Sequence, residues 1–190
     1  MNCLIGNNFV VHIRVVTMNG TGDLKTLTYI FGILKNKRGQ CLVLNDNRFS
    51  FIFLNTNELE SQDNTIKIRV YGKNDMTGGY PVTIFVQNCV VACSTKGDKK
   101  VNSLSKNTNS IDGKSREAIF FMKRIEGKTN HFKFESLLYP RWFLGFKSIS
   151  GMWELDLIEE DTDESGSRSL KFEFTINPVQ MLNRLIRSRH

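Results

Sequence analysis

A strand, a turn and a second strand are predicted by one stretch of the sequence, Phe134-Glu135-Ser136-Leu137-Leu138-Tyr139-Pro140-Arg141-Trp142-Phe143-Leu144. Polar and apolar residues alternate from His131 to Glu135, which is typical of a strand with one buried face. Pro140 favours a turn because its ring fixes the backbone. The apolar run that begins at Trp142 then predicts the return of the chain to a hydrophobic core.

Short strands separated by polar turns are predicted along most of the chain. Residues 65–70 and 170–176 show clean period-two alternation, and no segment of the body has a convincing helical period. The predicted strands are Phe9–Thr17, Leu27–Leu34, Cys41–Leu44, Phe49–Leu54, Thr65–Tyr71, Val82–Gln87, Val90–Cys93, Val101–Leu104, Ala118–Lys123, Phe132–Glu135, Trp142–Phe146, Trp153–Leu157 and Leu170–Ile176. Such a series indicates a β-sandwich or a β-barrel, and the residues alone leave both open.

The size and composition of the chain are those of one globular domain. It has 190 residues, of which 40% are hydrophobic and 24% charged. No apolar run approaches the length of a membrane span. His12 and Arg14 interrupt the apolar residues near the N-terminus, so this segment is not a secretory signal. We therefore expect a cytoplasmic start, and release by another route if the protein acts outside the cell.

The residues predict neither a metal site nor a catalytic group. The four cysteines are spaced irregularly, at Cys3, Cys41, Cys89 and Cys93. A cytoplasmic start favours free thiols, and no second pair completes a zinc site. The histidines, His12, His131 and His190, do not have the spacing of a metal site or a nucleophile. We expect no cofactor, no metal and no enzymatic activity.

The net charge of +7 is distributed unevenly. Residues 154–164 hold seven acids and no base, so the rest of the chain has 26 bases against 12 acids, a net charge of +14. A surface this basic attracts nucleic acid, heparin-like glycans or an acidic protein partner. The alternative is a solvated face that only keeps the protein soluble.

The opening stretch resembles the signature of the interleukin-1 cytokine family, which is Phe-x-Ser at Phe134, then Pro140, then a Phe-Leu pair at Phe143. From about Ile30 to Ile176 the order of the segments is most similar to the interleukin-18 branch. The segments that carry this similarity include Val70-Tyr71-Gly72-Lys73-Asn74-Asp75, Ala118-Ile119-Phe120-Phe121-Met122-Lys123-Arg124 and Met152-Trp153-Glu154-Leu155-Asp156-Leu157. The resemblance implies an all-β fold, a β-trefoil of about twelve strands in three pseudo-repeats, half of them forming a barrel and half a hairpin cap. The threefold repeat is not visible in the sequence itself.

The resemblance also implies a precursor that is cleaved and released. Inflammatory caspases cut after Asp, and Asp23 is the only acid before residue 46. Small residues around Asp23 fit an accessible loop. We therefore expect a pro-segment over residues 1–23, a trefoil cytokine domain over 24–178 and a basic C-terminal tail over 179–190. The junction of the family lies further on, near Tyr29 or Ile30, where this chain has no Asp.

The partners implied by the resemblance are two immunoglobulin-like receptor chains, an inflammatory caspase and a soluble binding protein, with the cytokine itself a monomer. Local alignment places six residues at receptor-facing positions. Lys37 and Asp46 face the first chain, Tyr80 and Lys123 form a second patch for that chain, and Lys100 and Glu117 face the second chain. Each is also explained as an exposed, solvated residue. The composition of interface hot spots favours Tyr80 among them.

Two departures from the family pattern bear on receptor recognition. Leu42 or Val43 stands where the family has an Arg, and Gly151 stands where it has an acid. Different charge pairs would then set specificity. The functional alternatives are a receptor antagonist or decoy of the same fold, and a heparin- or nucleic-acid-binding trefoil whose binding falls steeply with salt. The tail is either a frayed end or an amphipathic helix that contacts a membrane.

Overall fold

A computed structural model describes residues 3–5, 9–11, 26–72, 79–105, 115–160 and 170–174. Its strands are β1 (Cys3–Ile5), β2 (Phe9–Val11), β3 (Thr26–Lys35), β4 (Cys41–Asn45), β5 (Arg48–Ile52), β6 (Ile66–Tyr71), β7 (Tyr80–Val86), β8 (Cys89–Cys93), β9 (Val101–Ser105), β10 (Phe120–Arg124), β11 (His131–Ser136), β12 (Trp142–Ile149), β13 (Met152–Glu159) and β14 (Leu170–Phe174). The short helices are α1 (Thr56–Glu60) and the 3₁₀ turns η1 (Gln62–Asn64) and η2 (Arg116–Ala118). Among the residues that the structure describes, strands β1 and β2 pair only with each other.

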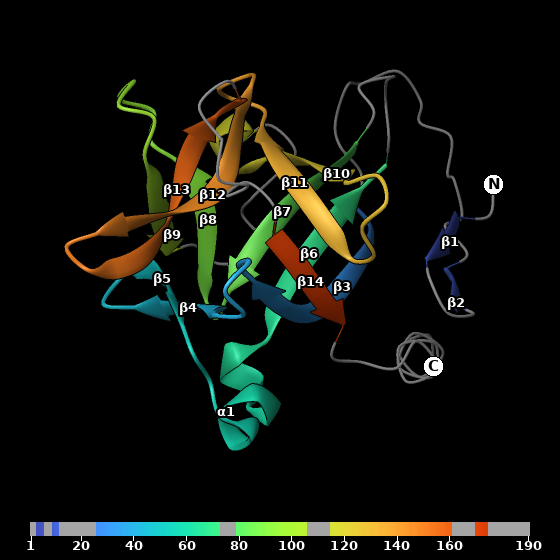
Figure 1. The fold of residues 1–190 in the computed structure, drawn as a ribbon. Helices are drawn as coiled ribbons and strands as arrows, with labels where there is room; N and C mark the ends of the chain where they lie inside the picture. The colour runs from blue at the N-terminus through green and yellow to red at the C-terminus, as the bar shows by residue number, and fades with distance from the viewer. Residues whose placement is uncertain are drawn as a thin grey trace.

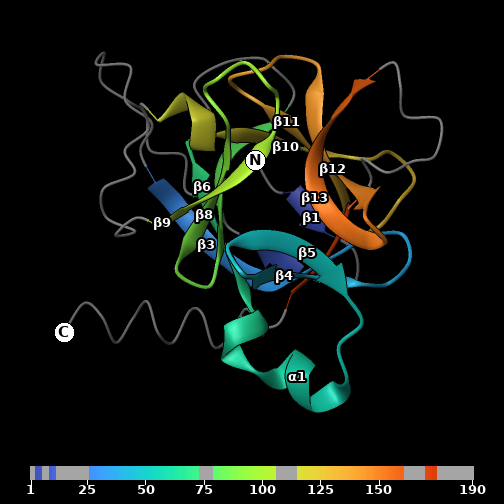
Figure 2. The ribbon, with the colours of Figure 1, turned by 90° about the vertical axis from the view of Figure 1, so that its left-hand side faces the viewer.

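Six of the remaining strands close on themselves as a barrel. The antiparallel pairings run from β3 to β6, β7, β10, β11, β14 and back to β3. The other strands form three hairpins, β4–β5, β8–β9 and β12–β13. Figure 1 shows these hairpins together on the left of the barrel strands, and Figure 2 looks onto that side. Closure removes the exposed edges that an open sheet of this size would carry.

This pairing divides the body into three units of four strands, β3–β6, β7–β10 and β11–β14. Each unit contributes two barrel strands and one hairpin, which is the plan of a β-trefoil. The expected all-β trefoil is therefore confirmed. Of the two architectures that the residues alone left open, the β-sandwich and the β-barrel, the structure has the barrel. The repeat is structural, since the sequence has no matching period.

The core sits inside the barrel, where alternate residues of each strand point inward. Ile66 and Ile68 of β6 are fully buried, as are Phe120, Phe134 and Phe172 from three other barrel strands. Burial of each such side chain stabilises the fold by about 2–3 kcal/mol. The period-two alternation predicted for residues 65–70 and 170–176 thus corresponds to the inward faces of β6 and β14.

A second, smaller cluster lies outside the barrel and explains the continuous apolar run of β8. Val90 and Ala92 pack with Phe85 and Ala118, while Cys89, Val91 and Cys93 face the main core. A strand buried on both faces has no need of polar alternation. Cys41, Cys89 and Cys93 are buried free thiols, the state expected for cysteines of a chain with a cytoplasmic start.

One glycine is required where the last strand closes the barrel. Gly32 of β3 pairs with Phe174 of β14. A Cβ added at Gly32 would lie 2.2 Å from the Glu173 carbonyl oxygen and 2.7 Å from the Phe172 ring. Only a residue without a side chain lets the two backbones approach this closely.

The polar segment between β5 and β6 differs from the prediction, because it contains helix α1. Figures 1 and 2 show this helix projecting from the body below the β4–β5 hairpin. Asn55 accepts a hydrogen bond from the Glu58 amide at 3.0 Å, and the Glu58 carboxylate accepts one from the Asn55 amide at 2.8 Å. This capping box starts a helix that is too short to show a helical period.

Candidate functional site

Tyr80 and Lys123, predicted to share one patch, are neighbours across the pairing of barrel strands β7 and β10, but their side chains leave opposite faces of the sheet. Tyr80 pairs with Met122 in the ladder between these strands. A Cβ added at Gly79 would lie 2.9 Å from Cγ of Lys123, so the chain before Tyr80 rests on the lysine stem. Tyr80 is half-buried and packs against the core cluster. A rigid, half-buried tyrosine beside a cation has the composition of an interface hot spot.

The charge of Lys123 is held in place by Glu135 of β11. The Lys123 ammonium donates a hydrogen bond to one carboxylate oxygen of Glu135, and the Arg141 amide donates to the other at 2.9 Å. Burial of Glu135 opposes its ionisation, but these bonds outweigh burial and hold the pKa of the carboxyl below its ordinary value. Lys123 therefore presents a fixed ammonium rather than a freely moving one.

Lys37 and Asp46 are both exposed, at opposite ends of β4. Lys37 lies in the turn between β3 and β4, which is organised by the buried Asn36; its side-chain oxygen accepts from the amides of Arg38 and Gln40 at 2.9 and 3.1 Å. Five strand residues at about 3.3 Å each separate the two turns by roughly 17 Å. A receptor surface that contacts both Lys37 and Asp46 would have to span this distance.

Asp46 has a structural role as well as its predicted one. It forms, with Asn47, the two-residue turn of the β4–β5 hairpin, and their φ values are +47° and +62°. Two positive φ angles define the type I′ turn that suits the twist of a hairpin, and Asp and Asn tolerate it better than other side chains. The turn is fixed to the next hairpin because the Ser103 hydroxyl donates to the Asn47 carbonyl at 2.6 Å.

Lys100 and Glu117 both lie near Cys93, at the end of β8. Val101, which follows Lys100, pairs with Cys93. Burial raises the pKa of the Cys93 thiol to about 11, and the nearby Glu117 charge adds to this, while a hydrogen bond with Ser136 opposes it. The two residues predicted to face the second receptor chain are thus placed near one another by β8 and η2.

The loop that carries Lys100 is fastened to the turn predicted at residues 137–141. The Tyr139 hydroxyl donates to the Ser94 carbonyl at 2.6 Å, and the Lys99 ammonium lies 4.2 Å from the centre of the Trp142 ring. Within the loop, the Ser94 side chain and the Lys100 backbone and charge hold the pKa of Asp98 below its ordinary value. The exposed lysines of this loop are therefore held in place by the contacts of the loop with this turn.

Sequence reasoning missed a groove beside the β12–β13 hairpin, an open hollow of about 620 Å³ that we call the β12–β13 groove. Its aromatic and aliphatic lining is Trp142, Phe146, Trp153, Leu157 and Ile158. Its polar lining is Lys37, Arg38, Lys147, Ser148 and Glu159. The chain has only two tryptophans, and both line this groove. The position of both tryptophans around one predicted hairpin was the sequence feature that could have indicated this groove.

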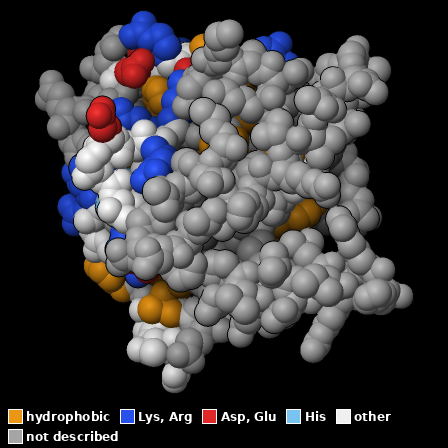
Figure 3. All heavy atoms as spheres, turned by 90° about the vertical axis from the view of Figure 1, so that its right-hand side faces the viewer, with side chains coloured by type: hydrophobic (Ala, Val, Ile, Leu, Met, Phe, Trp, Pro, Cys, Tyr) orange, Lys and Arg blue, Asp and Glu red, His pale blue; other side chains and the backbone are white. Residues whose placement is uncertain are grey.

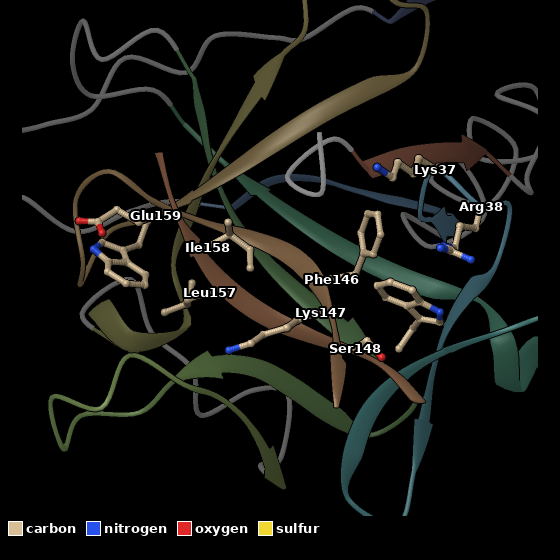
Figure 4. Close-up of a pocket in the computed structure, with 10 residues that line it drawn as sticks. Lys37, Arg38, Phe146, Lys147, Ser148, Leu157, Ile158 and Glu159 are labelled. Carbon is tan, nitrogen blue, oxygen red and sulfur yellow. The ribbon is translucent and has the colours of Figure 1, made fainter. Parts of the chain in front are cut away.

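The Arg38 guanidinium stacks on the indole of Trp153, with its carbon 4.4 Å from the ring centre. Trp153 also meets Phe146 edge to face, at 5.6 Å between centroids. Figure 4 shows Lys37, Arg38 and Phe146 at one end of the groove and Glu159 at the other. The β3–β4 turn therefore contributes two cations to a surface made mostly by β12 and β13.

Several expectations concern features outside these surfaces. No group of His, Cys, Asp and Glu in the described residues could hold a metal ion. Within the same residues, no helix is long and apolar enough to cross a membrane. On the face shown in Figure 3, lysine and arginine side chains recur over the described part, with few acidic ones. Asp23 and the 179–190 tail lie outside the described residues.

The model of one family, described as interleukin-1 / 18, matches residues 54–163, more than half of the chain. The chain belongs to the interleukin-1/18 family. Pig (Sus scrofa) interleukin-18 is 30% identical over 145 residues, which cover 74% of this chain and 73% of that protein. Cat (Felis catus) interleukin-18 is 26% identical over 179 residues, covering 88% and 91%. This member of the family is thus an interleukin-18-like cytokine, and its relatives are cytokines rather than enzymes.

Solved structures of the family share the fold at lower identity. A mutant of Gallus interleukin-1 beta has a TM-score of 0.63 at 16% identity, covering 79% of this chain and 99% of that chain. The NMR structure of interleukin-36alpha has a TM-score of 0.53 at 16% identity, covering 80% and 98%. At such identities the likeness establishes the trefoil of this interleukin-1/18 family member and nothing finer.

The departure at Gly151 has a structural reason. Gly151 and Ser150 form the two-residue turn of the β12–β13 hairpin, with φ values of +84° and +51°. An acidic side chain at Gly151 would have to adopt a conformation that L residues rarely occupy. With φ at +84° this position favours glycine over the acid that the family pattern places here, although Asp46 adopts a smaller positive φ in the corresponding turn of the β4–β5 hairpin.

Proposed function

We propose that this chain is the precursor of a pro-inflammatory cytokine that signals by bridging two immunoglobulin-like receptor chains. It is made in the cytoplasm, cut after Asp23 by an inflammatory caspase and released without a signal peptide. The product, residues 24–178 with the 179–190 tail, acts as a monomer, by binding and without enzymatic activity. Membership of the interleukin-1/18 family supports the proposal.

The observation that carries this proposal is the joint placement of Tyr80 and Lys123. The residues come from strands far apart in the sequence, yet the pairing of Tyr80 with Met122 makes them neighbours, and both side chains are partly exposed. Rigid aromatic residues lose little conformational entropy on binding, and a fixed ammonium orients a partner's acid. Lys100 and Glu117 lie elsewhere, around Cys93, which supports a separate site for a second chain.

The proposed maturation is tested by incubating the full chain with an inflammatory caspase and measuring the fragments by mass spectrometry. One cut after Asp23 and a gain of binding to the first receptor ectodomain are expected. Asp23→Glu should abolish the cut. Asp63→Asn is the matched control, because it removes another exposed aspartate that is not among the predicted receptor contacts. Full binding by the uncut chain, or a cut elsewhere, would overturn the pro-segment boundary.

The two receptor sites are tested with variants that separate binding from signalling. Tyr80→Ala should weaken binding to the first receptor chain by at least tenfold, about 1.4 kcal/mol. The double variant Lys100→Ala, Glu117→Ala should keep that binding and lose recruitment of the second chain. Lys96→Ala is the control, since Lys96 is an exposed cation of the same loop. Equal losses in all variants would contradict two separate sites.

Two other results would redirect the proposal. Tight binding to the first chain without recruitment of the second, in the unsubstituted cytokine, would identify a receptor antagonist or decoy. Retention on heparin that falls steeply with salt, together with no receptor complex, would identify a glycan-binding trefoil, which the net charge of +7 favours.

A further inference from the structure

The β12–β13 groove is elongated. Trp153 pairs with Ser148 near the hairpin tip, and Trp142 pairs with Glu159 at the far end. The six steps along β13 from Trp153 to Glu159 correspond to about 20 Å, at about 3.3 Å per residue. This length matches an extended chain of about six residues better than a compact small molecule.

Each tryptophan of the groove carries a cation on its ring. Arg38 lies 4.4 Å from the Trp153 ring centre, and Lys99 lies 4.2 Å from that of Trp142. These contacts hold the cations at the two ends of the groove. A stacked guanidinium still presents its planar N–H donors, which fit a carboxylate.

The charge that the groove presents to solvent is mainly positive. Lys37 and Arg38 are exposed, and the Lys147 side chain is 60% exposed. Asp156 pairs with Lys147 at 3.6 Å but is only 16% exposed, so the base and not the acid faces outward. Glu159 is the one acid among the lining residues that the structure describes, at the end away from Arg38.

We propose that the β12–β13 groove binds an extended acidic segment of a partner protein. Apolar side chains of the segment contact the half-buried Trp153 and Ile158, and its carboxylates pair with Lys37, Arg38 and Lys147. An extended chain projects alternate side chains to opposite sides. Its apolar side chains can therefore face the apolar floor of the groove while its acidic side chains face the basic rim. This docking does not use the receptor contacts proposed at Tyr80 and Lys100, but it shares Lys37 with the contact predicted for the first receptor chain.

Two other occupants fit the groove less well. A sulfated glycan would use the basic rim, but its sugar rings would compete with Arg38 and Lys99 for the indole faces. A second copy of this chain would bring two basic rims together, which opposes association. Both remain outcomes that the experiment can detect.

Intrinsic fluorescence tests the proposal directly, because both tryptophans of the chain line the groove. The probe is a hexapeptide of alternating aspartate and leucine, titrated into the full chain. A saturable change in emission with a Kd below about 100 µM is expected. Arg38→Gln should weaken binding about tenfold, because it removes a charged partner from a carboxylate.

The controls match charge, apolarity and fold. Arg124→Gln changes the net charge equally at an exposed residue outside the groove and should bind as the unsubstituted chain does. A lysine–leucine and an aspartate–serine hexapeptide should each bind at least tenfold more weakly. Trp153→Phe keeps Trp142 as reporter and should also weaken binding. Thermal unfolding shows whether each variant remains folded.

Four results would overturn the inference. The first is no saturable change up to about 1 mM of the aspartate–leucine peptide. The second is equal binding by folded Arg38→Gln and the unsubstituted chain. The third is tighter binding of a heparin hexasaccharide that Arg38→Gln abolishes, since the groove would then be a glycan site. Dimerisation blocked by the peptide would likewise assign the groove to a second copy.

Discussion

The Tyr139 hydroxyl donates a hydrogen bond to the Ser94 carbonyl oxygen at 2.6 Å, and so joins the turn after β11 to the loop after β8. Tyr139 is half-buried and Ser94 buried, so the bond is sheltered from water. The Ser94 amide in turn donates to the Lys100 carbonyl at 2.8 Å. The position of Lys100 therefore depends on a residue of the family signature stretch.

Tyr139→Phe should lower the free energy of unfolding by about 1–2 kcal/mol, because it leaves a buried carbonyl without its donor. The loop over residues 94–100 should also exchange its amide hydrogens faster, since its anchor is gone. Urea unfolding and hydrogen exchange followed by mass spectrometry measure the two effects. Unchanged exchange in this loop would show that the hydrogen bond does not position Lys100.

Lys123→Met should destabilise the protein at neutral pH and much less in acid. Its partner Glu135 has a folded-state pKa below its ordinary value of 4.5, so ionisation stabilises the fold above that value. This stability is lost as the pH falls through the lowered pKa. We expect a loss of about 1 kcal/mol at pH 7 that nearly disappears at pH 3.

Lys147→Met is the control for this pH dependence. The Lys147 side chain is 60% exposed and its ammonium lies 3.6 Å from Asp156. Solvent screens such a pair, so its loss should cost at most about 0.5 kcal/mol at either pH. Urea unfolding of both variants at pH 7 and pH 3 measures the difference. Equal, pH-independent losses would contradict the assignment to Glu135.

Gly32→Ala should be among the most damaging single changes in the barrel. The added methyl group would lie 2.2 Å from the Glu173 carbonyl oxygen, which belongs to the backbone and cannot move aside alone. We expect a loss of about 3 kcal/mol or a failure to fold, because β3 and β14 must separate. The control is Gly39→Ala, with no atom within 4 Å but a φ of +78°, which should cost about 1 kcal/mol. Similar melting temperatures for the two variants would show that β14 adapts.

The hairpin around Pro140 and the inward faces of β6 and β14 could be predicted because each depends on local periodicity. The contact of Gly32 with Phe172 could not, since no local pattern says which strands meet when a barrel closes. Helix α1 was missed for a different reason: it is held by two hydrogen bonds between Asn55 and Glu58, and Asn-x-x-Glu was its only signal.

The predicted site residues show the same division. The resemblance placed Tyr80 and Lys123 in one patch; the pairing of β7 with β10 makes them neighbours, but with their side chains on opposite faces of the sheet. It could not reveal that Asp46 sits in a turn with positive φ, since that depends on the register of β4 and β5. The stacking of Arg38 on Trp153 was also inaccessible, because it joins two distant turns. The receptor roles of the six residues stay predictions.

Cys93 should be almost unreactive in the folded protein at pH 8. It is 3% exposed, and burial raises the pKa of its thiol to about 11, so little thiolate forms and little reagent reaches it. Labelling by iodoacetamide should then require opening of the structure. The labelling rate, followed on the Cys93 peptide by mass spectrometry, should track the equilibrium for opening.

Ser136→Ala makes this dependence quantitative. The Ser136 hydroxyl lies 3.2 Å from the Cys93 sulfur and accepts from the Tyr139 amide at 3.1 Å, so its loss removes two buried contacts. A destabilisation of about 1.4 kcal/mol should raise the labelling rate about tenfold, because that free energy is a factor of ten in the opening equilibrium. Rapid labelling of Cys93 in the stable, unsubstituted protein would instead mean that β8 opens locally. The surface around Lys100 and Glu117 would then be mobile rather than fixed.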